Sequence, residues 1–204
     1  MGTGRLQAFS DGVIAIIITI MVLELQVPRE ATLAAFVKLA PVLLSYLLSY
    51  VVVAIMWVNH HHLIYLARRP EARLLWTNNV LLFWMSLIPF VTRYMGLNPK
   101  VPFAVALYGG VMTLSATAFT LLRHIVNLQL GRDREAAAYH RGKLWKSIYS
   151  TSLYAATVPL AYVSTSAAYA IFVLIPILYF IPERKLAAQA EEALDIPTGS
   201  TERD

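Results

Sequence analysis

The sequence predicts an all-α membrane protein with six transmembrane helices per subunit. The 204-residue chain is 58% apolar and 14% charged, and its mean hydropathy is +0.58. Apolar runs recur along the chain, and most could cross a hydrocarbon layer of about 30 Å at about 1.5 Å per residue. A soluble domain of this length has no interior large enough to bury so many uniformly apolar helices.

The first two spans are expected at about 6–27 and 36–66. They end before Pro28 and Pro70, and proline commonly lies where helices start or stop. The first run could be read as a signal peptide, but it is longer than the usual apolar region and only one basic residue, Arg5, precedes it. We therefore expect the run to be retained as a span.

The remaining four spans are expected at about 74–95, 102–127, 145–163 and 166–182. Pro89 lies inside the third run and predicts a kink there. A polar stretch of mixed charge separates the fourth run from the fifth, whereas only a few residues around Ser164 separate the fifth from the sixth. The six spans form one membrane domain at 1–183, and a cytoplasmic tail follows at 184–204.

The distribution of positive charge predicts that both termini are cytoplasmic. Only four of the 17 Lys and Arg residues then lie on the opposite side, namely Arg29, Lys38, Arg93 and Lys100. Because cytoplasmic loops carry such an excess, the net charge of +5 needs no nucleic-acid partner. No aromatic–basic stripe typical of base-stacking proteins occurs. The absence of cysteine excludes disulfides, thiolate catalysis and Cys-based metal sites.

Polar residues at the start of the first span form the first candidate site. Arg5, Phe9, Ser10 and Asp11 lie within seven residues. Ser10 and Asp11 are favourable near a helix N-terminus, so one interpretation is a simple helix start. The other is a polar network that fixes this helix to its neighbours, since ionisable groups inside a span are costly and are candidates for function.

These residues also support a resemblance to a known family. The pattern Arg5-x-x-x-Phe9-Ser10-Asp11, followed by Gly-Val-x-Ala-Ile, resembles the signature of the transmembrane protein 175 family of potassium channels. The resemblance implies a homotetramer in a prokaryotic cell membrane that conducts potassium passively without a cofactor. It also implies that the first helix lines a central pore, with bulky apolar side chains in place of a filter of backbone carbonyls. Consistently, the sequence has no Thr-Val-Gly-Tyr-Gly filter loop.

Carried over by spacing from the signature, the constriction of the family falls on Ile16, Thr19 or Ile20, and Leu23. At about 100° per residue these side chains share one side of a helix, whereas Asp11 lies about 140° away from Ile16. The alternative is that they are ordinary residues of a buried helix.

Glu24 follows this stripe at the expected outer mouth of the pore. It either contributes to a ring of carboxylates that attracts cations or pairs with Arg29 or Lys38.

A second group of polar residues lies at the cytoplasmic end of the second span. Trp57, His60 and His61 share one helix face at i, i+3 and i+4, whereas three consecutive histidines cannot all reach one metal ion. Depth and resemblance favour contact between this face and the Arg5–Ser10–Asp11 cluster, with imidazole bonding to carboxylate. A solvated cluster and a metal site are the alternatives.

Asn78 and Asn79 in the third span are expected to form hydrogen bonds between helices. They complete the set of polar residues for which we expect a role within the membrane.

Two other functions are compatible with single features of the sequence. A proton-coupled secondary transporter could use Asp11 and the histidines of the second span as a relay, but no inverted repeat is detectable and no acidic residue lies near a bilayer midplane. An intramembrane metal hydrolase lacks support because no His-Glu-x-x-His motif occurs. We therefore do not expect an enzyme.

Overall fold

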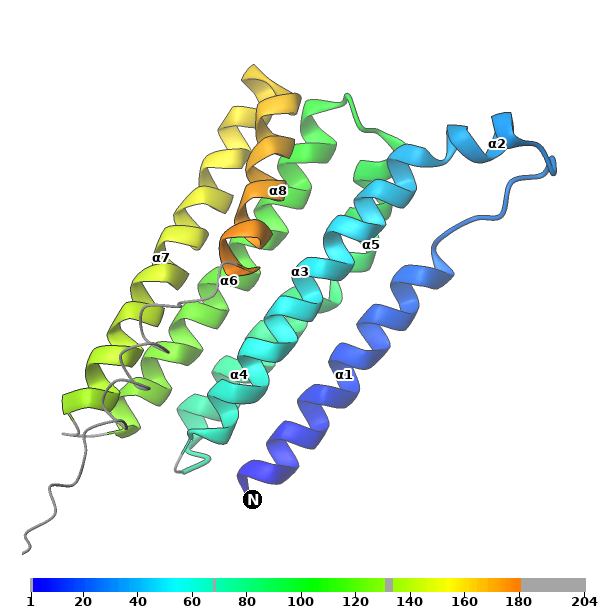
Figure 1. The fold of residues 1–204 in the computed structure, drawn as a ribbon. Helices are drawn as coiled ribbons and strands as arrows, with labels where there is room; N and C mark the ends of the chain where they lie inside the picture. The colour runs from blue at the N-terminus through cyan, green and yellow to red at the C-terminus, as the bar shows by residue number, and fades with distance from the viewer. Residues whose placement is uncertain (1, 68, 131–133, 181–204) are drawn as a thin grey trace, which may run out of the picture.

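The computed structural model describes residues 2–67, 69–130 and 134–180, and every regular element within them is a helix. The elements are α1 (Thr3–Leu23), α2 (Leu33–Lys38), α3 (Ala40–Tyr65), α4 (Ala72–Ser86), α5 (Ile88–Leu97), α6 (Pro102–Leu130), α7 (Arg134–Val163) and α8 (Thr165–Phe180). The long helices run side by side as a bundle, with the N-terminus at one end and α2 at the other (Figure 1). We refer to the end that contains α2 as the distal end. The predicted all-α class is confirmed.

Four stretches of the described chain are long and apolar enough to cross a membrane, fewer than the six expected. They are Thr3–Leu23, Ala40–Tyr65, Ala72–Leu97 and Pro102–Gln129. Of the two remaining long helices, α8 is apolar but has only 16 residues. The other, α7, includes Ser147, Ser150 and Thr157 among its buried residues.

The helices depart from the expected ranges at three places, and a proline accompanies one of them. The third expected span is two helices, α4 and α5, joined at Leu87, with Pro89 in the first turn of α5. Because proline has no backbone N–H, it cannot donate the hydrogen bond that continues a helix. A break at this point therefore leaves no backbone donor without a partner. The first helix ends at Leu23, four residues before the expected boundary, and the fifth begins at Arg134 instead of 145. The expected tail at 184–204 lies outside the described residues.

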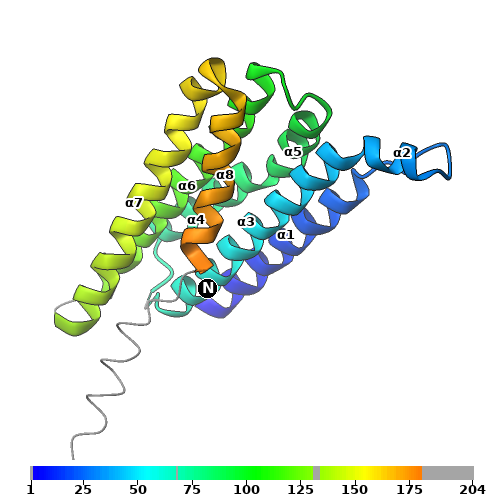
Figure 2. The ribbon, with the colours of Figure 1, turned by 45° about the horizontal axis from the view of Figure 1, so that its top comes forward.

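The bundle has α6 packed along α7 and α4, while α1 packs on α3, α4 and α5 at one side (Figure 2). Two glycines allow close approach of helices. A Cβ on Gly96 of α5 would lie 2.9 Å from the Cα of Val42 in α3, and one on Gly109 of α6 would clash with Thr157 of α7. The first helix contacts α3, α4 and α5, whereas α7 and α8 pack on the other part of the bundle.

Candidate functional site on the first helix

The two sides of α1 have different surroundings. Its buried residues are Leu6, Ser10, Ile14, Ile17 and Met21, all at most 3% exposed. Their spacing of three or four residues defines one face of a helix, which packs on α3, α4 and α5. The rotation of α1 about its own axis is thereby fixed within the subunit.

The opposite side of α1 is uncovered and largely apolar. Phe9 is 55% exposed, Ile16 58%, Ile20 41% and Leu23 80%. Thr19 is also exposed, and its hydroxyl donates a hydrogen bond of 2.9 Å to the carbonyl of Ile16. The structure thus places all four residues of the expected constriction on the uncovered side. We call Ile16, Thr19, Ile20 and Leu23 the α1 stripe.

A buried chain of hydrogen bonds connects α1 to α4 and α3. The Asn78 amide donates to the Ser10 hydroxyl at 3.0 Å, and the same hydroxyl donates to the Leu6 carbonyl at 2.9 Å. Since that amide orientation leaves Oδ1 of Asn78 as an acceptor, His60 Nε2 donates to it at 2.7 Å. Ser10, Asn78 and His60 are each 0% exposed. We call these three residues the buried anchor.

Asp11 lies beside the buried anchor in a more exposed cluster. The indole N–H of Trp57 donates to Asp11 Oδ1 at 2.9 Å, while His61 Nδ1 lies 3.9 Å from Asp11 Oδ2. The Gln7 amide donates to that same nitrogen of His61 at 2.8 Å. The hydrogen bond to the carboxylate therefore comes from an indole, not from the imidazole that the sequence favoured.

Two of the residues predicted to belong to the polar network, Arg5 and Phe9, lie outside these clusters. Arg5 and Phe9 are exposed, and within the described residues the Arg5 side chain has no hydrogen bond or ion pair. The three consecutive histidines have different partners. His60 bonds Asn78 and His61 bonds Gln7, whereas His62 Nδ1 donates to the carbonyl of Val58 at 2.7 Å. No group of three potential metal ligands occurs in the described part of the chain.

Glu24 directly follows α1 and forms an ion pair with Arg93 of α5. Both side chains are about one-third exposed, at 36% for Glu24 and 33% for Arg93. Neither partner considered from the sequence, Arg29 or Lys38, takes this role. From the sequence, Arg93 was counted only among the four positive charges opposite the cytoplasm. Its position inside the helix-forming run 74–95 could have indicated an ion pair with another helix.

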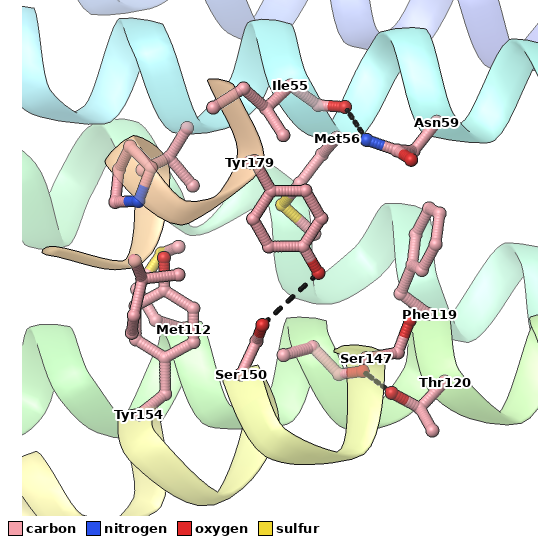
Figure 3. A pocket seen from close by; sticks show the side chains of 14 residues that line it. Ile55, Met56, Asn59, Met112, Phe119, Thr120, Ser147, Ser150, Tyr154 and Tyr179 are labelled. Carbon is pink, nitrogen blue, oxygen red and sulfur yellow. Dashed lines mark hydrogen bonds between the residues drawn. The ribbon is translucent and has the colours of Figure 1, made fainter. Parts of the chain in front are cut away.

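A cavity of about 50 Å³ lies away from α1, between α3, α6, α7 and α8 (Figure 3). Its walls include Met56, Met112 and Tyr154, and the hydroxyls of Ser150 and Tyr179 lie 3.2 Å apart at one side. None of its lining residues is charged. No residue of α1 lines this cavity, so it is separate from the clusters described above.

The apolar spans and the polar contacts between them define a polytopic α-helical integral membrane protein. Residues 5–89 match the family described as endosomal/lysosomal potassium channel TMEM175. The chain is 35% identical to a potassium channel of Chryseobacterium sp. (strain P1-3), over 94% of this chain and 100% of the relative. The chain belongs to the TMEM175 family.

Two further similarities cover almost the whole chain. A potassium channel of Streptomyces collinus is 31% identical over 91% of this chain and 98% of the relative. The crystal structure of a lysosomal potassium-selective channel TMEM175 homolog from Chamaesiphon minutus matches with a TM-score of 0.78 and 26% identity, over 87% of this chain and 95% of that one. The fold is therefore shared along the length of the subunit.

Proposed function

We propose that the chain is one subunit of a potassium channel and that several copies assemble with their α1 helices around a common axis. The observation that carries this proposal is the α1 stripe, which is uncovered along the helix although the opposite face is tightly packed. We assign potassium as the conducted ion because the relatives are named potassium channels. Following the resemblance of the sequence, we propose four copies.

In this assembly the α1 stripe forms the narrowest part of the path. Rings of Ile16, Ile20 and Leu23 would pass ions only when wide enough to hold water, and would stop conduction by dewetting when narrower. Thr19 places a hydroxyl oxygen in the same stripe, and that oxygen keeps its acceptor capacity because its hydrogen points to Ile16. Selectivity would then arise from partial loss of hydration, which is less costly for potassium than for sodium.

The buried anchor keeps the α1 stripe directed toward the axis. Rotation of α1 would separate Ser10 from Asn78 and break the hydrogen bond between them inside a low-dielectric bundle. Hydrogen bonds between membrane helices contribute about 0.6 kcal/mol on average, with a maximum of about 1.7 kcal/mol. The bond between Ser10 and Asn78 therefore adds to the packing of the buried face of α1 in favouring one rotation of the helix.

We propose that α7 and α8 complete six spans, and that both termini face the cytoplasm of a prokaryotic cell. Six crossings place the two ends of the chain on the same side. The excess of Lys and Arg in the loops on that side supports the orientation.

The alternative is a proton-coupled transporter that uses Asp11 and His61, which lie 3.9 Å apart. Reconstitution of the purified protein in liposomes, followed by measurement of potassium, sodium and proton fluxes, separates the two functions. A channel gives potassium flux down its own gradient without a pH gradient. Flux that requires a proton gradient and saturates with substrate would contradict the proposal and support the transporter.

A further inference from the structure

A long apolar groove runs between α3 and α8. These two helices are neighbours in the bundle (Figures 1 and 2). Its volume is about 560 Å³, and its walls are almost wholly apolar. The lining includes Pro41, Leu44, Leu47 and Val51 of α3 together with Val173 and Ile177 of α8. Pockets that hold ligands typically have about 300–1,000 Å³. The groove is therefore large enough for a ligand with a long apolar part.

The length of the groove matches the depth of one lipid leaflet. Its lining on α3 runs from Pro41 to Val51, which is about 15 Å at ~1.5 Å per residue. This is half of the hydrocarbon layer, which is about 30 Å thick. On α8 the lining runs from Tyr169 to Ile177 in parallel with it. An acyl chain that enters from the distal end of the bundle would fill the groove and end near the bilayer midplane.

Two lysines lie at the distal end of this groove. Lys38 is the last residue of α2, three residues before Pro41, and Lys100 directly follows Pro99, which is also part of the lining. Both lysines are exposed, and neither forms an ion pair with another described residue. Basic residues beside openings between membrane helices attract anionic lipid headgroups. Their position therefore complements a negative charge at the mouth of the groove.

From these observations we infer that the α3–α8 groove binds one acyl chain of an anionic phospholipid, whose phosphate lies between Lys38 and Lys100. A phospholipid is favoured over a helix from a second copy, because the two exposed lysines at the end of the groove match a phosphate and have no carboxylate partner among the described residues. This inference goes beyond ion conduction and does not depend on it.

Native mass spectrometry of the purified oligomer tests this site, with phosphatidylglycerol or phosphatidylcholine of identical acyl chains added. At about fivefold for each of the two lysines, we expect the wild type to bind phosphatidylglycerol roughly 25-fold more tightly than phosphatidylcholine. The double variant Lys38→Gln/Lys100→Gln should lose this preference and still bind both lipids. Arg29→Gln is the matched control, because it removes a positive charge near the same end away from the groove.

A second pair of variants tests the groove itself. Val173→Trp fills the groove and should reduce binding of both lipids at least tenfold. Val80→Trp introduces the same side chain at a residue of nearly equal exposure, 48% against 49%, on α4 away from the groove, and should leave binding unchanged. Size-exclusion profiles establish that both variants are folded.

Three results would overturn the inference. The first is equal binding of the two lipids by the wild type. The second is unchanged lipid binding in a folded Val173→Trp variant. The third is a change in the number of subunits in Val173→Trp with unchanged lipid binding per subunit, which would assign the groove to a second copy.

Discussion

Arg93 of α5 forms an ion pair with Glu24, the residue that directly follows α1. The pair joins the distal end of α1 to the same short helix that packs on α3 and α6. It also neutralises the carboxylate that would otherwise stand alone at the mouth of the proposed pore. In the proposed pore, Glu24 would therefore position α1 through Arg93, and its charge would attract cations only as far as Arg93 leaves it uncompensated.

Replacement of Arg93 by Gln should expose the charge of Glu24. We expect potassium flux into liposomes to rise at low ionic strength, because a free carboxylate raises the local cation concentration. The increase should disappear in high salt, where the screening length falls from about 30 Å at ~0.01 M to about 3 Å at ~1 M. Because the pair is partly exposed, the loss of stability should stay below about 1 kcal/mol.

The control for this prediction is Arg29→Gln, which removes a nearby positive charge that has no ion pair in the described structure. The same rise in flux for both variants would contradict a specific role of the Arg93–Glu24 pair.

Replacement of Asn78 by Leu should disrupt the buried anchor. The change removes the acceptor of His60 Nε2 and the donor to Ser10, and water cannot replace Asn78 because both residues are buried. Ser10 keeps its bond to Leu6, so the larger cost falls on His60. Leaving a buried polar group without a partner costs about 1–3 kcal/mol, so thermal unfolding in detergent should occur at a clearly lower temperature. Asn79→Leu is the matched control, because the adjacent amide is exposed. Equal effects of the two substitutions would exclude the anchor.

The Trp57–Asp11 hydrogen bond should matter less to stability than the buried anchor. Trp57 is 41% exposed, so water can replace the indole at the carboxylate after Trp57→Phe. We expect a loss of stability at or below the usual net value for one hydrogen bond, about 0.5–1.5 kcal/mol. Asp11→Asn keeps an acceptor oxygen for Trp57 and should lie close to wild type. A loss after Trp57→Phe as large as that of Asn78→Leu would show that the exposed cluster is the main attachment of α1.

Polar substitution in the α1 stripe should change conduction directly. Ile16→Asn or Leu23→Asn introduces a hydrated amide into the proposed constriction, which favours water there and opposes dewetting. We expect higher flux, a lower ratio of potassium to sodium flux, or both. Val80→Asn, on the exposed side of α4, should behave like the wild type. Unchanged fluxes for both stripe variants would count against a pore along α1.

Much of this architecture could be predicted from the sequence, because a bilayer allows few ways to arrange apolar helices. The polar residues Ser10, Asp11, His60 and Asn78 were recognisable since each stands out in an apolar run. The partners were harder to assign. That Trp57 rather than His61 would bond Asp11 depends on the rotation of α1 against α3.

The break at Leu87 and the partner of Glu24 also required the structure. Pro89 predicts a kink, but the separation of the run into α4 and α5 at Leu87 is seen only in the structure. The ion pair between Arg93 and Glu24 joins residues far apart in the sequence, so it arises from tertiary contacts and not from a local pattern.

Cysteine accessibility tests the central claim most directly, because the chain has no native cysteine. Single cysteines at Ile16, Thr19 and Leu23 would be treated with a membrane-impermeant cationic thiol reagent while potassium flux into liposomes is recorded. Cysteines at Ile17 and Val80 serve as buried and outward-facing controls. We predict that flux falls in the stripe variants, most rapidly at Leu23, and stays constant in both controls. Modification of the stripe without any change in flux, or flux loss only at Val80, would contradict a conduction path along α1.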